Sequence, residues 1–254
     1  MTTVQSTRRF EGRVALVTGA GTGMGAEIAV LLAERGADVA LVGRREQPLR
    51  DVAARIEATG SKALVVPGDV SDPRSVRQAV DTAVSSLGDL HHAVNNAGIS
   101  SSGTEITDVS DDEWQNTLQI NLSGLFYGVR AQVAAMQAAG HGGSIVNVSS
   151  VFADRGLAQR AAYSAAKHGI RGLTRSAAVD WAARGIRINE LQPGVIATPM
   201  LGDDPAGAER VAATIPARRL GSGREVATAV AFLLSDEASY ITGAHLAVDG
   251  GFLA

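Results

Sequence analysis

Tyr163 and Lys167 are the two residues of this sequence whose types and spacing most directly indicate chemistry. They lie four positions apart in AAYSAAKHGI, residues 161–170. Side chains at i and i+4 share a helix face, so the phenol and the ammonium group can converge on one point. A free phenol ionises near pH 10, and a positive charge about 5 Å away contributes on the order of 3 kcal/mol at an effective dielectric constant of about 20. The pair predicts a tyrosine that exchanges protons near neutral pH, although such pairs are also common on solvated helices.

The elements that must position this pair alternate regularly along the chain. Short apolar runs rich in β-branched residues are followed by longer amphipathic segments, which is typical of parallel strands covered by helices. We expect strands at 13–18, 38–42, 62–66, 90–95, 144–149, 186–191 and 245–249, and helices near 24–35, 46–59, 73–87, 111–138, 161–183 and 223–235. The predicted fold is α/β, a Rossmann-type, doubly wound, seven-stranded parallel sheet flanked by helices. No linker divides the 254 residues, so we expect a single domain, 1–254, with a flexible tail at 1–11.

Composition excludes several classes of function. The residues are 45% hydrophobic and 19% charged with a net charge of -3, which provides a large core and no polyanion-binding signature, so we expect no nucleic acid partner. Zero cysteines exclude disulfides and thiolate ligands and suit a reducing cytosol. The N-terminus lacks an apolar run of signal-peptide length, and the uncharged stretch 131–153 is interrupted by glycines and His141. We therefore expect a cytoplasmic protein that does not engage a membrane.

A glycine-rich loop follows the first predicted strand. The segment TGAGTGMG, residues 18–25, leads directly into the helical sequence AEIAVLLAER. Glycines let the backbone approach a pyrophosphate, and the start of a helix offers free N–H groups and the positive end of its dipole. In the first βαβ unit such a loop predicts a dinucleotide site, with glycines that serve only a tight turn as the alternative. The loop fits both G-x-G-x-x-A, through Gly21, Gly23 and Ala26, and T-G-x-x-x-G-x-G, through Thr18, Gly19, Gly23 and Gly25.

Positive charge follows the second predicted strand. Folds that prefer NAD place an acidic residue about twenty residues past the loop, against the ribose 2′-hydroxyl. This chain has Gly43, Arg44 and Arg45 there. Arginines suit a 2′-phosphate and leave no acceptor for the hydroxyl group, so we expect NADP(H) as the cofactor. Glu46 is the competing observation, because its carboxylate could partly neutralise the arginines, which could also simply begin a solvated helix.

The order and spacing of four motifs resemble the short-chain dehydrogenase/reductase family, in its single-domain branch. The motifs are T-G-x-x-x-G-x-G at 18–25, NNAG at 95–98, VNVSS at 146–150 and Y-x-x-x-K at 163–167. The resemblance runs from about Gly12 to Phe252, nearly the whole chain. It implies an oxidoreductase that transfers a hydride between a nicotinamide cofactor and a ketone or secondary alcohol.

The resemblance implies four catalytic residues. Tyr163 matches the general acid/base, and Ser150 matches the hydroxyl group that holds the substrate oxygen. Lys167 matches the lysine that contacts the nicotinamide ribose and lowers the pKa of the tyrosine. Asn121, in QINLSGLF, matches the helix asparagine that helps to hold a water in the proton relay. Without the resemblance, Asn121 could merely satisfy backbone groups, and Ser150 could be a turn residue.

The resemblance also implies how the cofactor is held. Asp69 in GDV matches an adenine contact, Asn95–Gly98 matches the segment beneath the cofactor, and Thr198 in PGVIAT matches the residue that meets the nicotinamide amide. The expected cofactor-binding residues are Gly19, Gly21, Thr22, Gly23, Met24, Gly25, Gly43, Arg44, Arg45, Asp69, Val70, Asn96, Ala97, Gly98, Tyr163, Lys167, Pro193, Gly194, Ile196 and Thr198. We expect no metal, because the sequence suggests no compact cluster of histidines and carboxylates; His91 and His92 are merely adjacent at a strand start.

Three segments that follow strand ends are expected to form the pocket of a small-molecule substrate. They are 99–103, 151–160 and a segment at 199–216 that we expect to act as a lid, because its glycines and proline suit a mobile flap. The inward candidates are the apolar residues Phe152, Leu157, Met200, Leu201 and Val211. They predict a preference for uncharged, moderately hydrophobic ketones or secondary alcohols. Arg155 and Arg160 are the reservation, because either could anchor a carboxylate.

The predicted helix 161–183 contains Gly169 and Gly172, which weaken a helix. Close contact with another subunit would explain both glycines. This helix and the C-terminal segment AVDGGFLA resemble the family's interface elements, and the resemblance implies a homotetramer. The alternative substrate is a 3-oxoacyl-[acyl-carrier-protein], with Arg184 as one basic contact but His141 at the other expected basic position. A second alternative is a non-catalytic dinucleotide-binding sensor, which would lack at least one of the four catalytic residues. A third is an enoyl reductase, but enoyl reduction usually requires a spacing longer than four between the tyrosine and the lysine.

Overall fold

The apolar runs form one seven-stranded sheet in the computed structural model, which describes residues 9–202 and 204–254. All neighbouring strands pair in parallel, in the order β3-β2-β1-β4-β5-β6-β7. The strands are β1 (Val14–Thr18), β2 (Asp38–Gly43), β3 (Ala63–Pro67), β4 (His92–Asn95), β5 (Gly143–Val148), β6 (Ile186–Pro193) and β7 (His245–Val248). Strand order reverses between β1 and β4, and ligands of doubly wound sheets bind outside the carboxyl ends of the strands at such a point.

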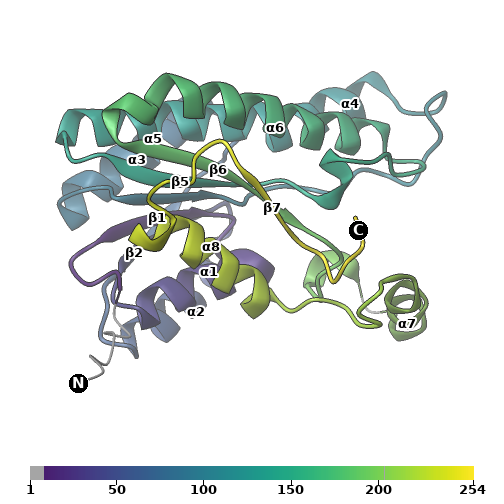
Figure 1. Ribbon diagram of the computed structural model, residues 1–254, viewed down its shortest axis with the longest axis horizontal. Coiled ribbons are helices and arrows are strands. Elements are labelled where there is room, and N and C mark those ends of the chain that lie inside the picture. Colours follow the sequence, from purple (N-terminus) through teal and green to yellow (C-terminus); the bar gives the residue numbers. More distant parts are fainter. Residues whose placement is uncertain (1–8, 203) are drawn as a thin grey trace.

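Helices cover both faces of the sheet. One layer contains α1 (Gly23–Glu34), α2 (Glu46–Glu57) and α8 (Gly223–Leu234), and the other contains α3 (Pro73–Leu87), α4 (Asp111–Leu118), α5 (Gly124–Ala139) and α6 (Ala161–Trp181). Figure 1 shows the two layers below and above the sheet, with α7 (Pro205–Thr214) standing apart from both at the right. The predicted α/β class, parallel sheet and single domain are confirmed.

Each face of the sheet buries its own apolar core. Ile28 and Leu32 of α1 and Leu49 of α2 belong to the first, and Met136 of α5 and Ile170 of α6 belong to the second. All five are essentially inaccessible to solvent. Burying a side chain of this size contributes roughly 1.5–3 kcal/mol, so the two cores hold the strand ends in fixed relative positions.

Helix ends follow local sequence signals. The Asp72 side chain accepts a hydrogen bond from the N–H of Arg74 at 2.9 Å and caps α3, which begins at Pro73. Gly36, Gly60 and Gly88 come just after helices and have φ between 89° and 100°, a backbone conformation that side chains disfavour. These signals explain why α1, α2 and α3 end within two residues of the expected positions.

The structure differs from the expected elements in three places. The expected helix 111–138 is divided into α4, a π-helical turn at Gln119–Ser123, and α5. The lid segment is partly helical, as a 3₁₀ turn at Pro199–Leu201 and α7, and its residue 203 lies outside the described residues. Phe10 belongs to the expected tail at 1–11, but its side chain is buried against His92; residues 1–8 lie outside the described residues.

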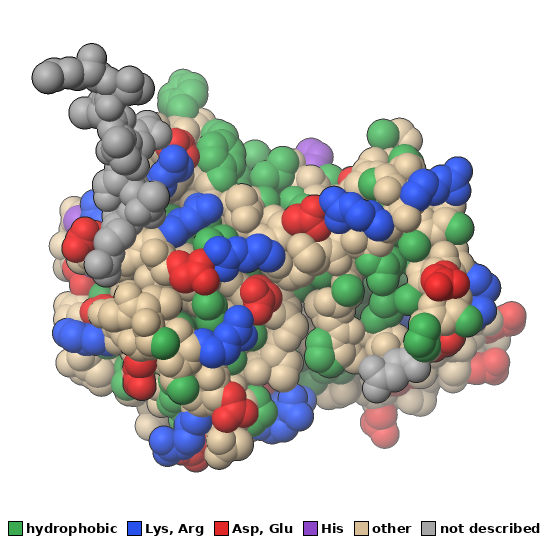
Figure 2. Space-filling view, turned by 90° about the horizontal axis from the view of Figure 1, so that it is seen from below, with side chains coloured by type: hydrophobic (Ala, Val, Ile, Leu, Met, Phe, Trp, Pro, Cys, Tyr) green, Lys and Arg blue, Asp and Glu red, His purple; other side chains and the backbone are tan. Residues whose placement is uncertain are grey.

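The face that α1, α2 and α8 present to solvent has mixed charge. Figure 2 shows Lys and Arg side chains interspersed with Asp and Glu over this face rather than gathered by sign. Arg55 pairs with Glu27 at 2.8 Å, and Arg224 pairs with Glu34. This face therefore offers no broad positive surface to a polyanion. Among the described residues, no helix has the length and apolarity needed to cross a bilayer.

Candidate active site

The glycine-rich loop forms a tight cradle between β1 and α1. A Cβ atom on Gly25 would lie 2.2 Å from the carbonyl oxygen of Gly19, which leaves no space for a side chain. Gly19 and Gly23 have φ of 65° and 58°, so each adopts a backbone that glycine favours. Thr22 is the N-cap residue of α1, but its hydroxyl group does not cap the helix, and the first turn contains no acidic residue. The amide groups at this helix start are thus available to an anion.

Neighbouring segments hold the cradle in place. The Thr18 hydroxyl oxygen accepts hydrogen bonds from the N–H groups of Asn96 and Ala97 at 3.0 and 3.1 Å, and the Asn96 amide donates to the Thr18 carbonyl at 3.0 Å. The Asn96 side chain therefore ties two loops together. A Cβ atom on Gly23 would lie 3.4 Å from the Thr198 side chain, so the loop after β6 reaches the cradle. Ile196, by contrast, turns its side chain into the core.

A cavity of about 120 Å³ opens beside the cradle and is lined by seven of the residues expected to bind a cofactor. Those seven are Gly19, Gly43, Arg44, Asp69, Val70, Ala97 and Gly98. Hydrogen bonds from Ser71 and the nearby Arg44 hold the pKa of the Asp69 carboxyl group below its usual range, in spite of partial burial. Glu46, which could have neutralised the arginines, pairs with Arg50 instead.

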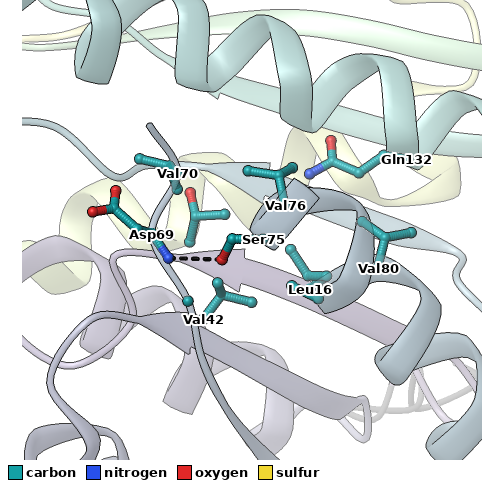
Figure 3. Close-up of a pocket in the computed structure, with 11 residues that line it drawn as sticks. Leu16, Val42, Asp69, Val70, Ser75, Val76, Val80 and Gln132 are labelled. Carbon is teal, nitrogen blue, oxygen red and sulfur yellow. Dashed lines mark hydrogen bonds between the residues drawn. The ribbon is translucent and has the colours of Figure 1, made fainter. Parts of the chain in front are cut away.

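A smaller cavity lies beneath Asp69. Its volume is about 10 Å³, and Leu16, Val42 and Val80 are among its apolar lining residues. Figure 3 shows these side chains and the hydrogen bond of 3.0 Å from the N–H of Asp69 to the Ser75 hydroxyl oxygen. A space of this size holds at most one water molecule. It is a packing gap that leaves Asp69 fixed by α3, and it is no ligand site.

Asn121 lies within the π-helical turn that divides α4 from α5. Its side chain is buried, with Oδ1 accepting from the N–H of Ile99 at 2.8 Å and Nδ2 donating to the carbonyl of Ile99 at 2.9 Å. Both ends of the amide therefore hold the start of the loop after β4. A π-turn also changes the backbone hydrogen bonding of a helix locally and is frequent at functional sites.

Ser150, Tyr163 and Lys167 meet beyond the carboxyl end of β5. Ser150 and Lys167 are buried, and Tyr163 is partly exposed and hydrogen-bonded to Ser150. The ammonium group of Lys167 lies 5.5 Å from the centre of the Tyr163 ring and donates to the Val148 carbonyl at 3.1 Å. The spacing of the two residues on α6 thus brings the phenol and the ammonium group together, as predicted.

Burial acts against the expected lowering of the Tyr163 pKa. Burial raises the pKa of the Tyr163 phenol above its usual value near 10, against the effect of the Ser150 hydrogen bond. Burial also lowers the pKa of Lys167 to about 8, while Glu190 acts in the opposite direction. Burial therefore opposes both the ionised phenol and the charged lysine on which the expected lowering of the Tyr163 pKa depends. Sequence reasoning omitted this competition because it did not include the cost of burying the lysine.

A buried carboxylate beneath the site was missed by sequence reasoning. Glu190 of β6 is 1% exposed, accepts from Nε of Arg171 at 3.0 Å, and accepts from the hydroxyl group of Ser149. Arg171 also pairs with Asp154 through two nitrogen atoms. The only available signal was a glutamate within the apolar strand sequence IRINEL. This network connects β5, β6 and α6 next to Ser150 and Lys167.

The segments expected to form the substrate pocket differ in exposure. Phe152 packs edge-on against Phe252, with ring centres 6.2 Å apart, and Arg155 stacks over Phe252 at 4.9 Å. Met200 is 59% exposed and Leu201 40% exposed, so these two inward candidates are not enclosed in the described chain. No residue of α7 is buried. Helix α7 therefore leaves its side chains at least partly exposed, whereas Ile215, near the end of the expected lid segment, is buried.

A compact group of histidines and a carboxylate does occur, contrary to expectation. Ligand atoms of Asp89, His91 and His141 lie within 4.8 Å of one another, away from the pair on α6. However, Nδ1 of His91 accepts from the N–H of Val14 at 3.1 Å, so the neutral ring carries its proton on Nε2, the atom nearest Asp89. The stacked rings of His91 and His141 are nearly parallel, so their nitrogen lone pairs do not converge. This group lacks the ligand geometry of a metal centre.

Comparisons with known proteins agree with this arrangement. A family model described as "Enoyl-(Acyl carrier protein) reductase" matches residues 19–253. The chain is 41% identical to a cyclohexanol dehydrogenase of Acinetobacter sp. (strain SE19) over 244 residues, 96% of each chain. It is 44% identical to a trans-4-hydroxycyclohexanecarboxylate dehydrogenase of Sinomonas cyclohexanicum over 249 residues, 96% of this chain and 93% of the relative.

Solved structures of similar fold bind either form of the nicotinamide cofactor. Carveol dehydrogenase from Mycobacterium avium in complex with NAD superposes with a TM-score of 0.93 at 32% identity, covering 96% of this chain and 99% of that one. A blue fluorescent protein from a metagenomic library in complex with NADPH superposes with a TM-score of 0.91 at 38% identity, covering 97% of this chain and all of that one.

Proposed function

Because this chain belongs to the short-chain dehydrogenase/reductase family, we propose that it transfers a hydride between NADP(H) and a secondary alcohol or the corresponding ketone. The observation that carries the proposal is the convergence of Tyr163, Ser150 and Lys167 beside a glycine cradle. All four expected catalytic positions are filled, which favours an enzyme over a non-catalytic sensor. The spacing of four between Tyr163 and Lys167 favours carbonyl chemistry over enoyl reduction.

The nicotinamide group supplies or accepts the hydride when it is bound. In the direction of reduction, Tyr163 donates its phenolic proton to the carbonyl oxygen of the substrate, and in oxidation it removes the proton of the alcohol. Ser150 donates a hydrogen bond to the same oxygen as charge develops on it. Lys167 orients the ribose and, when charged, favours the ionised tyrosine. Asn121 holds the loop that borders the site and supports a proton path through water.

The cradle fits a dinucleotide because side chains are excluded where phosphates approach. A Cβ atom on Gly25 would clash with Gly19, and the start of α1 has neither a capping side chain nor an acid. We favour NADP(H) because Arg44 borders the adjoining cavity and Glu46 is engaged by Arg50. Arg45, the N-cap residue of α2, adds further positive charge. The 2′-phosphate would pair with these guanidinium groups.

Cyclic secondary alcohols are the substrates that we propose. Two relatives above 40% identity are dehydrogenases of cyclohexanol and of 4-hydroxycyclohexanecarboxylate. The alternative, an acyl carrier protein, loses support because His141 bonds to Asp89 at 2.8 Å and Arg184 stacks on Trp181. We further propose that 199–216 closes over bound substrate as a lid. The absence of cysteine supports a cytoplasmic location.

The test is to supply the purified protein with cyclohexanol or 4-hydroxycyclohexanecarboxylate, each with NADP⁺ and with NAD⁺. Formation of reduced nicotinamide is followed by absorbance. We expect oxidation of at least one of the two alcohols and a lower KM for NADP⁺ than for NAD⁺. If neither alcohol nor the corresponding ketones react with either cofactor, the proposed function is wrong.

A further inference from the structure

The residue before α6 is an arginine with a buried nitrogen atom that has no partner. The carbonyl of Arg160 accepts from the N–H of Ser164 at 2.9 Å, so the first helical turn begins at Arg160. Nη1 of Arg160 is buried and makes no hydrogen bond to any described residue. Throughout 9–202 and 204–254, no carboxylate is paired with this guanidinium group.

Arg160 is the N-cap residue of α6 and precedes Tyr163 by three positions. Tyr163 and Lys167 lie within the helix at i and i+4 and share one face, and Ser164 follows Tyr163 directly. The hydroxyl oxygen of Ser164 is also buried without a hydrogen-bond partner among the described residues. Two buried polar atoms without a hydrogen-bond partner in the part of the chain that the structure describes, Oγ of Ser164 and Nη1 of Arg160, therefore lie in the residues around the start of α6.

The loop after β4 joins the catalytic pair to Arg160. At the start of this loop, a Cβ atom on Gly98 would lie 3.7 Å from the ammonium nitrogen of Lys167. At its end, a Cβ atom on Gly103 would lie 3.0 Å from Nη1 of Arg160. Between them, the buried hydroxyl oxygen of Ser101 has no partner in the described chain. One loop thus borders both the reacting centre and the arginine.

The sequence left two arginines as candidates for anchoring a carboxylate, and the structure distinguishes them. Arg155 is exposed and rests on the Phe252 ring at 4.9 Å. Arg160 instead places a donor in a buried position, where leaving it unpaired is unfavourable. Its positive charge also lies at the positive end of the α6 dipole, and the first turn of α6 contains no acidic residue. A bound anion would relieve both conditions.

We infer that Arg160 is a specificity residue that binds a carboxylate carried by the alcohol or ketone substrate, an inference that rests on the proposed function. A guanidinium group pairs with a planar carboxylate through two parallel hydrogen bonds. Arg160 lies against Gly103 at the end of the loop after β4, whereas Lys167 lies near Gly98 at its start. The carboxylate is therefore several bonds away from the carbinol carbon, as across a ring, rather than adjacent to it as in a 2-hydroxy acid.

The experiment compares Arg160→Gln with Arg155→Gln as the matched control. The kcat and KM of each are measured with 4-hydroxycyclohexanecarboxylate and with cyclohexanol at saturating NADP⁺. We expect Arg160→Gln to raise KM for the carboxylate substrate at least about tenfold and to change KM for cyclohexanol less than about twofold. Arg155→Gln should leave both constants unchanged. Thermal melting checks folding, and the melting temperature of Arg160→Gln should not fall, because an unpaired charge is removed.

A measurement of ligand binding without turnover tests the role of Arg160 independently of the proposed function. Cyclohexanecarboxylate, which has no hydroxyl group, is titrated calorimetrically into each variant saturated with NADP⁺. Binding that is lost in Arg160→Gln and kept in Arg155→Gln supports the inference, even if the wild type oxidises neither alcohol and the proposed function fails. Equal binding to all variants, or an equal loss of activity on both alcohols in Arg160→Gln, overturns it. If Arg160→Gln does not fold, Arg160→Lys is used in its place. We expect Arg160→Lys to raise KM for the carboxylate substrate by a smaller factor and to leave KM for cyclohexanol unchanged. An unchanged KM for the carboxylate substrate in Arg160→Lys would also contradict the inference.

Discussion

Replacing Glu190 by Gln should make Lys167 lose its proton at a lower pH. Glu190 is buried in β6 and is the group that opposes the effect of burial on the pKa of Lys167, which is about 8. Glutamine has nearly the same shape but no charge. Arg171 keeps its two bonds to Asp154 after the substitution, so we expect the variant to fold. The change therefore tests an electrostatic role more than a packing role.

The size of the effect follows from the backbone between the two charges. Lys167 donates to the carbonyl of Val148, and Glu190 accepts from the side chain of Ser149, the next residue. Each charge lies within hydrogen-bond distance of one of two adjacent residues, whose Cα atoms are about 3.8 Å apart, so we take a separation of roughly 6–8 Å for the charges. At an effective dielectric constant of about 20 their attraction is about 2–3 kcal/mol, or roughly 1.5–2 pKa units. Without it, the pKa of Lys167 falls well below 8, and the lysine is largely neutral at pH 8.

The assay is the pH dependence of kcat/KM for alcohol oxidation. A neutral Lys167 no longer favours the ionised form of Tyr163, so the rise in activity with pH should move to higher pH by about one to two units in Glu190→Gln. The double variant Glu190→Gln/Arg171→Gln removes both charges of the pair and should return the profile part of the way. A Glu190→Gln profile that is uniformly lower but unshifted would refute the reasoning and leave Glu190 only a structural role.

Two other predictions concern the cofactor and assembly. Arg44→Asp should reverse the order of the Michaelis constants so that KM is lower for NADH than for NADPH; equal constants for both cofactors in the wild type would exclude the assigned role. Light scattering at micromolar concentration should give the mass of a homotetramer, because α5 and α6 expose Phe126 at 41% and Val179 at 80%. A monomer mass would count against this assembly.

The architecture could be predicted because each strand and helix carried its own signal. Apolar runs, helix caps such as Asp72 and glycines after helices determined the element types and most of their limits. The division of the helix around Asn121 could not be predicted, since a π-turn depends on contacts made with the loop after β4. Gly169 also has a reason within the chain that the sequence did not reveal, because a Cβ atom there would lie 2.9 Å from the Leu122 side chain.

The sequence could predict which candidate residues lie close together in the structure, but it could not predict the electrostatics around them. Short motifs indicated the residues that line the cradle and those that meet on α6. Burial raises the pKa of Tyr163 and lowers that of Lys167, and burial depends on packing from distant elements. Glu190 and Arg160 gave only weak signals, because a single charged residue in a sequence does not reveal which partners surround it.

The most direct test of the proposed hydride transfer is the substitution Tyr163→Phe. This change removes only the phenolic hydroxyl group and leaves the ring, the cradle and Lys167 in place. The account predicts that NADPH binds to the variant with the affinity of the wild type, measured by calorimetry, while kcat for alcohol oxidation and ketone reduction falls at least about 100-fold. Turnover close to that of the wild type, with NADPH bound normally, would contradict the role of Tyr163 as the general acid and base.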